Sequence, residues 1–280
     1  MIALVLIVGF MAAEVVAGIL AQSLALLSDA AHMLTDAGAI ALALLALRLA
    51  ARPAGGNLTY GLKRAEILSA QVNGAVLLVL AVLIVYEAIA RLVTPPAVGG
   101  WTVLIVALAG IAVNGLATLQ LARANRANMA IEGSFQHILT DLYAFVGTAI
   151  AGGIIILSGF DRADPIASLF VAALMLRAAY GLLKASGRVL LEIAPEGMSA
   201  DEIGRALVAQ PNVSSIHDLH VWEIGTGFPA LSAHVLVPPG EDCHAIRREL
   251  ETMLAERFGI EHTTLQVDHA RPARLLKIGG

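Results

Sequence analysis

The sequence predicts an α-helical membrane domain of six transmembrane helices, followed by a small cytoplasmic α+β domain. Of its 280 residues, 58% are hydrophobic and 14% are charged, and the mean hydropathy is +0.79. Soluble domains are nearer half apolar and a quarter charged, so a soluble fold is excluded for most of the chain. Charged residues number 21 in 1–194, about 11% of that part, and 19 in 195–280, about 22%. We therefore expect a membrane domain over 1–194 and a soluble domain over 195–280.

Six apolar segments account for the membrane domain. They are expected near residues 2–22, 24–50, 66–93, 101–123, 130–158 and 164–191. Each can cross a hydrocarbon core of about 30 Å, which needs about 20 helical residues. Proline and glycine mark most of the breaks, whereas the break at Gln22-Ser23 is short, so the first two helices should form a tight hairpin.

The charges of the connections predict the orientation in the membrane. Basic residues gather in the connections between the second and third and between the fourth and fifth segments: Arg48, Arg52, Lys63, Arg64, Arg123 and Arg126. The other side offers only Arg91 and Arg162. The positive-inside rule puts the first group in the cytoplasm, and six crossings then put both termini there. We expect a multi-pass protein of the cell membrane, which is the inner membrane in a Gram-negative organism.

The soluble part has the pattern α-β-β-α-β. A helix should begin after Ser199 and end near Ala209, and strands are expected over Val213–Ile224 and Ala230–Val237, joined by a glycine-containing turn. An amphipathic helix over Asp242–Phe258 and a strand over His262–Asp268 complete it. A net charge of −4 gives no support to nucleic-acid binding, and the single Cys243 excludes a disulfide framework and a cysteine-cluster metal site within one chain.

Ionisable residues inside two of the membrane segments are the strongest functional signal. The second segment carries Asp29, His32 and Asp36, and the fifth carries His137 and Asp141. Such residues cost about 3 kcal/mol each to insert, so they mark functional sites. The segments His-Met-Leu-Thr-Asp and His-Ile-Leu-Thr-Asp match at four of five positions. In each, the His and the Asp lie one helical turn apart on one face, where both can bind a single ion.

The two pairs should also lie at the same depth. With a rise of about 1.5 Å per residue, His32 and Asp36 lie about 13 and 20 Å from the outer end of their helix, and His137 and Asp141 about 10 and 16 Å from the inner end of theirs. The two helices run antiparallel, so the four side chains converge near the middle of the membrane. Two nitrogens and two oxygens in a roughly tetrahedral set suit Zn²⁺.

Two further acidic residues have open roles. Asp29 shares a helix face with His32 and Asp36, and it can support the metal ligands or line an exit path, or it can cap the hairpin. Glu14, in the first helix, can line the pathway, or it can have a packing or water-facing role. A satisfied structural polar group is the alternative for any one such residue, but two matched segments make it a poor explanation of the pairs.

Five motifs together give the chain a family resemblance. They are the segment from Ser23 through His32 to Asp36, Tyr60–Glu66, His137–Asp141, Ala163-Asp164-Pro165, and His217-Asp218-Leu219-His220-Val221-Trp222. With these motifs the chain resembles the cation diffusion facilitator family of the zinc-efflux type. The resemblance implies six transmembrane helices, a cytoplasmic ferredoxin-like domain, a homodimer in the lipid bilayer, and exchange of metal for protons. It also implies that His32, Asp36, His137 and Asp141 form the transport site.

The resemblance further implies a metal site in the cytoplasmic domain. His217, His234 and Asp268 match its ligand positions, and His244 matches a bridging position. Gln266 stands where one relative has a ligand histidine, which weakens the assignment. Solvated strand histidines are the alternative. The connections 53–62 and 122–134 contain no histidine, unlike some relatives.

These observations predict a secondary transporter that exports a divalent transition-metal cation, Zn²⁺ first, in exchange for protons, and not an enzyme. An intramembrane metalloenzyme and a membrane metal sensor are the alternatives. Catalytic zinc usually keeps a ligand position open, whereas four ligands leave none, and the sequence has no HExxH motif. No signalling module is evident. Metal flux across liposomes separates transport from both alternatives.

Overall fold

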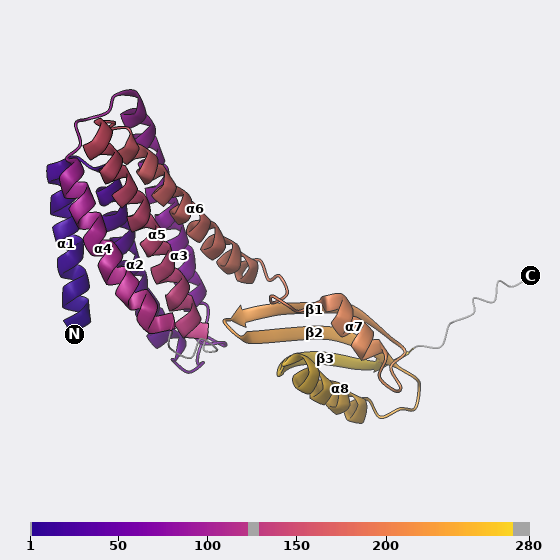
Figure 1. The fold of residues 1–280 in the computed structure, drawn as a ribbon. Helices are drawn as coiled ribbons and strands as arrows, with labels where there is room; N and C mark the ends of the chain where they lie inside the picture. The colour runs from indigo at the N-terminus through magenta and orange to yellow at the C-terminus, as the bar shows by residue number, and fades with distance from the viewer. Residues whose placement is uncertain (1, 123–128, 271–280) are drawn as a thin grey trace, which may run out of the picture. The chain divides into compact units, whose positions relative to one another are not determined.

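A computed structural model describes the backbone of residues 2–122 and 129–270. The side chains of residues 2–10, 36, 40, 117, 118, 120–122 and 129–138 lie outside the described part, as do Arg123 and Arg126, which entered the prediction of orientation. The described residues form six long helices, then a domain with two helices and three strands (Figure 1). The long helices are α1 (Ile2–Ala21), α2 (Leu24–Ala50), α3 (Ala65–Val93), α4 (Gly100–Ala122), α5 (Met129–Ser158) and α6 (Ala163–Leu190).

These helices confirm the predicted membrane class, and their ends differ by about one residue from the expected segments. By length and composition, four described stretches can cross a membrane: α2, α3, Leu139–Ser158 of α5, and α6. Shorter apolar stretches are Met11–Ala21 in α1 and Gly100–Leu116 in α4. Many large apolar side chains of these helices are exposed, among them Leu20, Tyr86 and Leu157. Such a surface suits hydrocarbon rather than water.

The chain divides into two compact units, which are described separately. The first unit takes in residues up to 42 and residues 72–183, and the second takes in residues 43–71 and those from 184 onward. In the first unit α4 and α5 pack closely because glycines replace larger side chains at their contact. A Cβ atom at Gly152 would lie 2.9 Å from the backbone nitrogen of Leu104, and one at Gly110 would lie 2.3 Å from the ring of buried Phe145. Small residues of this kind let membrane helices approach each other.

Replacing Gly110 with alanine should loosen this contact. The added methyl group would overlap the Phe145 ring, and overpacking of this kind typically destabilises by about 1–3 kcal/mol. We expect Gly110→Ala to lower the melting temperature of the purified protein in detergent. Gly115→Ala in the same helix is the control, because nothing lies within 4 Å of its added methyl group and alanine is the better helix former by about 1 kcal/mol. Equal melting temperatures for the two variants would contradict the close contact.

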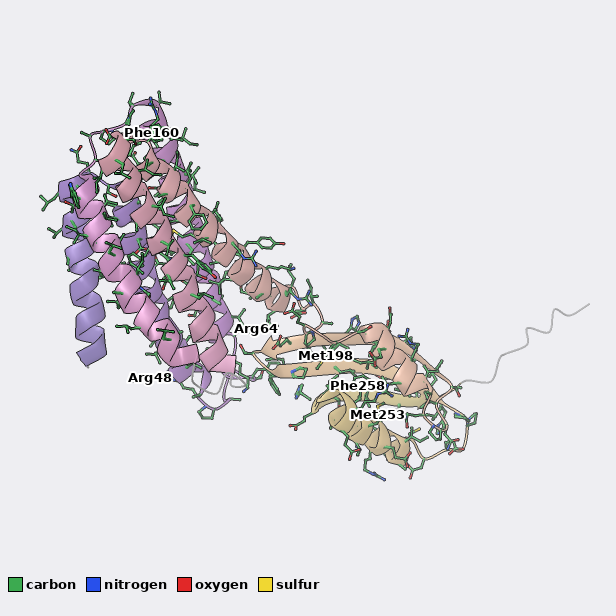
Figure 2. All side chains as sticks on the ribbon, viewed as in Figure 1. Arg48, Arg64, Phe160, Met198, Met253 and Phe258 are labelled. Atoms are coloured by element: carbon green, nitrogen blue, oxygen red, sulfur yellow. The ribbon has the colours of Figure 1, made fainter. Side chains whose placement is uncertain are left out.

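The cytoplasmic domain has the predicted order of elements. It consists of α7 (Ala200–Val208), β1 (Ser215–Gly225), β2 (Phe228–Val237), α8 (Cys243–Phe258) and β3 (His262–His269). The sheet order is β1-β2-β3, with β1 antiparallel and β3 parallel to β2. Its buried core joins α7, α8 and the sheet and includes Leu207, Leu231 and Leu250. Met198, Met253 and Phe258, labelled in Figure 2, pack against this core.

Both helices of this domain begin and end with the expected local chemistry. Ser199 caps α7, because its side chain accepts a hydrogen bond from the Glu202 backbone nitrogen. The Asp242 carboxylate accepts from the backbone nitrogens of Ala245 and His244 at the start of α8, and these bonds lower its pKa. Gly259 ends α8 in a left-handed conformation, with a φ of 67°.

Candidate functional site

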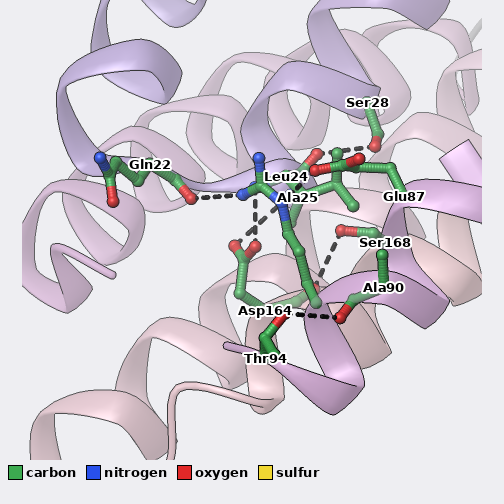
Figure 3. A network of polar contacts seen from close by, with 10 residues as sticks. Gln22, Leu24, Ala25, Ser28, Glu87, Ala90, Thr94, Asp164 and Ser168 are labelled. Carbon is green, nitrogen blue, oxygen red and sulfur yellow. Dashed lines mark hydrogen bonds and ion pairs between the residues drawn. The ribbon is translucent and has the colours of Figure 1, made fainter. Parts of the chain in front are cut away.

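The first turn of α2 is fixed by a buried aspartate from another helix. Asp164, in the first turn of α6, is completely buried. Its carboxylate accepts hydrogen bonds from the Leu24 nitrogen at 2.7 Å and from the Ala25 nitrogen at 3.4 Å (Figure 3). It also accepts one from the Ser23 hydroxyl. The backbone amides of Leu24 and Ala25 are among those that the start of a helix leaves without partners. Asp164 thereby joins the start of α6 to the start of α2, the helix that carries His32.

An arginine holds the turn that precedes α2. The Arg91 guanidinium donates to the Gln22 carbonyl oxygen at 2.7 Å and to Glu87 at 2.9 Å. Gln22 itself has a positive φ of 54°, and its fixed carbonyl stabilises this sharp turn. Sequence reasoning missed both contacts of the turn. It used Asp164 only as part of a family motif and Arg91 only as a loop charge, although an acidic residue in the first turn of a helix was an available signal.

Inside the helical unit, the structure brings together one histidine and one aspartate of the predicted four. His32 of α2 is buried, and its Nε2 lies 3.6 Å from Oδ1 of Asp141 in α5. The side chains are 9% and 17% exposed, so water has little access to either. Nearby hydroxyls are engaged within their own helix: Ser28 donates to the Leu24 carbonyl and Thr35 to the Ala31 carbonyl. The Ser28 and Thr35 hydroxyls therefore donate to their own helix and not to His32 or Asp141.

The other two predicted ligands lie on the same two helices. Asp36 and His137 have helical backbone in α2 and α5, one turn from His32 and Asp141 respectively, but their side chains lie outside the described part. Among the described side chains, no group of three or more histidine, cysteine, aspartate or glutamate residues is arranged to hold a metal ion. Convergence of all four residues thus remains a prediction. The structure describes two of the four side chains, those of His32 and Asp141.

Two more acidic side chains, in α1 and α2, are buried. Glu14 of α1 is completely buried and Asp29 of α2 is 2% exposed. The Glu14 carboxyl group interacts directly with that of Asp29 across the α1–α2 hairpin. Asp29 therefore faces another carboxylate, and the helix start is capped by Asp164 instead of Asp29.

In the cytoplasmic domain, two of the four residues named for a metal site lie together. His217 of β1 and His234 of β2 are directly opposite each other, and their rings stack with centroids 5.1 Å apart. Asp268 of β3 pairs in register with Leu236, whereas Gln266 occupies the place beside His234. The Gln266 amide donates to the Asp268 carboxylate at 2.8 Å. Asp268 and His244 do not join the histidines in a group of three potential ligands in the described structure.

Another histidine contact of this domain was not anticipated. Cys243 Sγ lies 3.5 Å from Nε2 of His269, and the same nitrogen lies 3.0 Å from the Glu241 carbonyl oxygen. Sequence reasoning could not find this pair, because 26 residues separate its members and no metal-binding spacing links them.

The buried pair of His32 and Asp141 has the chemistry of a transition-metal site. Neutral imidazole nitrogen and carboxylate oxygen are zinc ligands, and protons compete for both atoms. With two more such ligands, His32 and Asp141 would complete a four-ligand site that binds a dehydrated cation. Such a set of four protein ligands would fill the coordination positions of a tetrahedral zinc ion.

Comparison with known families agrees with this chemistry over nearly the whole chain. Residues 1–191 match the family model described as the cation efflux transmembrane domain. Residues 195–270 match the model described as the cation efflux protein, cytoplasmic domain. The chain belongs to the cation efflux family. The resemblance found in the sequence motifs is therefore confirmed, and the chain is a transporter rather than an enzyme.

Curated relatives are similar over most of their length. A cadmium, cobalt and zinc/H(+)-K(+) antiporter of Bacillus subtilis is 38% identical over 96% of this chain and 88% of the relative. The zinc transporter ZitB of Escherichia coli is 41% identical over 93% and 84%. The metal cation efflux system protein CzcD of Cupriavidus metallidurans is 38% identical over 96% and 85%. A solved structure of the metal-bound C-terminal domain of CzcD is 33% identical, covering 25% of this chain and 99% of that one, with a TM-score of 0.25.

Proposed function

We propose that this cation efflux protein exports Zn²⁺ from the cytoplasm in exchange for protons, and that His32, Asp36, His137 and Asp141 bind the ion during transport. The observation that carries the proposal is the approach of His32 to Asp141, 3.6 Å apart and largely buried between two apolar helices. The names of the relatives, which include zinc transporters and an antiporter that exchanges metal for protons and potassium, support the choice of ion and counter-ion.

The proposed mechanism is competition at one site. Zn²⁺ binds neutral histidine and ionised aspartate, so metal binding releases protons and protonation releases metal. Histidine titrates near neutral pH, so a site open to a more acidic exterior gains protons and loses its metal. When the site faces a more alkaline cytoplasm, it loses protons and binds metal again. Alternating access of the helices turns this competition into exchange.

We further propose that the protein is a homodimer of the cell membrane with both termini in the cytoplasm. The basic residues of the 2–3 and 4–5 connections support this orientation. The match to the cytoplasmic domain of cation efflux proteins supports placement of residues 195–280 on the inner side. The membrane and cytoplasmic domains are proposed to divide at residues 194 and 195, between the spans of the two family models.

Flux into proteoliposomes with an imposed pH gradient tests this function. We expect uptake of Zn²⁺ into vesicles when the vesicle interior is the more acidic side, together with loss of protons from the interior. Parallel assays with Cd²⁺, Co²⁺, Fe²⁺ and Mn²⁺ rank the ions. No metal-dependent flux with any of the five would contradict the proposal, and flux that ignores the pH gradient would contradict proton exchange.

A change of ligand chemistry at His32 should change which ions pass. In His32→Asp an oxygen replaces a nitrogen, and harder or larger cations are then less disfavoured. We expect the ratio of Mn²⁺ or Cd²⁺ flux to Zn²⁺ flux to rise several-fold. His220→Asp, the same replacement at an exposed strand position, is the control and should leave the ratios unchanged. An unchanged ratio in His32→Asp would mean that His32 does not contact the ion.

A further inference from the structure

One buried carboxylate, that of Asp164, is bonded through both of its oxygens to the beginning of α2. Its Oδ2 accepts a hydrogen bond from the Leu24 nitrogen, and its Oδ1 accepts one from the Ala25 nitrogen, as Figure 3 shows. Oδ1 also accepts from the Ser23 hydroxyl. The Arg91 guanidinium interacts electrostatically with the same carboxylate and so compensates its buried charge. Asp164 is thus positioned to hold α2 and not to bind an ion.

Ser23 and Asp164 contribute differently to the start of α2. The Ser23 side chain accepts a hydrogen bond from the Leu26 nitrogen at 3.2 Å, which is the usual bond of a residue that caps a helix. This bond is local, so it determines where α2 begins in the sequence. The bond between Asp164 and the Leu24 nitrogen spans 140 residues, so it determines which neighbouring helix the start of α2 is attached to. Loss of the Asp164 carboxylate would therefore leave α2 helical but loosen its attachment to α6.

The attachment lies in a closely packed apolar place. Ala25 and Leu26 of α2 are completely buried. The cluster around them includes Ile155 of α5 and Ala167 of α6. Hydrogen bonds to a carboxylate are strong in such surroundings, and their loss leaves buried amide groups without partners. The start of α2 therefore has little freedom to shift while Asp164 holds it.

A shift at the start of α2 would reach the proposed transport site. His32 follows Leu24 by eight residues in one continuous helix, a distance of about 12 Å along its axis. A helix of this length moves as a unit because its backbone hydrogen bonds link successive turns. Asp141, 3.6 Å from His32, lies in α5, which only the four residues 159–162 separate from α6. Asp164 therefore attaches the helix of His32 to the helix that directly continues the chain from α5.

We propose that Asp164 is a positioning residue of the transport site, which sets the depth and rotation of α2 and so holds His32 within reach of an ion bound by Asp141. The proposal rests on the proposed function and adds to it a residue that does not touch the metal. Zn²⁺ requires ligand nitrogen at about 2.0–2.1 Å in a tetrahedral arrangement, so a displaced His32 would weaken its binding. Mn²⁺, which favours oxygen ligands, would lose less. Misplacement of α2 therefore lowers both the affinity for Zn²⁺ and the selectivity.

The KM for Zn²⁺ flux into proteoliposomes and the ratio of Mn²⁺ or Cd²⁺ flux to Zn²⁺ flux at limiting metal test this role. In Asp164→Asn an amide nitrogen replaces one oxygen, so at least one bond to α2 is lost. We expect KM to rise about 10-fold or more, as loss of a group that supports metal ligands commonly causes, and the flux ratio to rise several-fold. Ser23→Ala removes one bond to Asp164 and should change both quantities in the same direction by less. Asp161→Asn is the control and should match the wild type, because Asp161 accepts from the Val98 nitrogen and not from α2.

The other outcomes overturn the positioning role. If Asp164→Asn and Ser23→Ala keep the wild-type KM and flux ratio, Asp164 only stabilises the fold, whatever their melting temperatures. If maximal flux falls while KM and the flux ratio are kept, Asp164 acts in another step of transport. If Asp164→Asn does not elute as the wild type does in size-exclusion chromatography, Ser23→Ala decides by the same two quantities. An equal change in Asp161→Asn would mean that α2 is not the element through which the effect acts. Failure of the proposed function itself is separate, because it would appear as absence of Zn²⁺ flux in the wild-type protein.

Discussion

Replacing Asp141 with asparagine should abolish metal transport while the protein still inserts and assembles. The change is isosteric, so the packing of α5 is kept, but it removes the negative charge 3.6 Å from His32. A divalent cation in this buried place would then lack one anionic ligand, and an uncompensated buried charge is strongly destabilising. Removal of a supporting group near a metal typically costs 10–100-fold, so loss of a ligand should lower flux by about 100-fold or more. Asp36→Asn should behave in the same way.

Proteoliposome flux at saturating Zn²⁺ provides the measurement, with size-exclusion chromatography as the test of assembly. Thr148→Val is a matched control in the same helix, because Thr148 is buried and its hydroxyl bonds only to the Ala144 carbonyl of its own helix. This control should transport normally. Wild-type flux in either Asp141→Asn or Asp36→Asn would overturn the assignment of the transport site. Loss of flux in Thr148→Val as well would show that any polar change in α5 disturbs the fold.

Local sequence patterns predicted the helices and strands and the approach of His32 to Asp141, because the signals for both are short-range. The length of an apolar segment predicts a membrane helix. A histidine four residues before an aspartate predicts that both side chains lie on one helix face, where they can bind one ion. Matched depth on antiparallel helices then placed His32 beside Asp141, which are 109 positions apart in the numbering yet 3.6 Å apart in space. Helical periodicity was sufficient to predict this contact, because both residues are ionisable groups in otherwise apolar helices.

Other features depend on contacts that no local pattern reveals. Asp164 bonds to Leu24 across 140 residues, and its own neighbours in sequence give no indication of the partner. The close fit of Gly110 against Phe145 likewise requires the packed pair of helices. In β1, the register shifts between His217 and His220, and Asp218 lies there with a positive φ of 51°. A non-glycine residue rarely adopts that conformation, and no local pattern in the sequence indicates this irregularity of the strand.

The cytoplasmic domain combines excess negative charge with a histidine pair. Residues 195–280 contain 12 acidic and 7 basic residues, a formal charge of −5. Two such domains that approach each other in a dimer would repel unless cations or apolar contacts offset the charge. His217 and His234 already stack on neighbouring strands, and Asp268 accepts a hydrogen bond from Gln266, the residue paired with His234. A divalent cation could therefore both complete this group and reduce the repulsion.

Zinc should accordingly stabilise the isolated domain of residues 196–280 and strengthen its dimer. A ligand that binds only the folded form contributes about 2.7 kcal/mol at a free concentration 100 times its dissociation constant. For a domain of this size that corresponds to a rise in melting temperature of about 10–20 °C. Thermal melts and sedimentation with zinc and with a chelator provide the measurements. His234→Ala should remove the effect, whereas His220→Ala, an exposed histidine at no predicted ligand position, should keep it. If zinc changes neither melting nor association, the domain dimerises through apolar contacts alone and Gln266, beside His234, has replaced a ligand that this chain lacks.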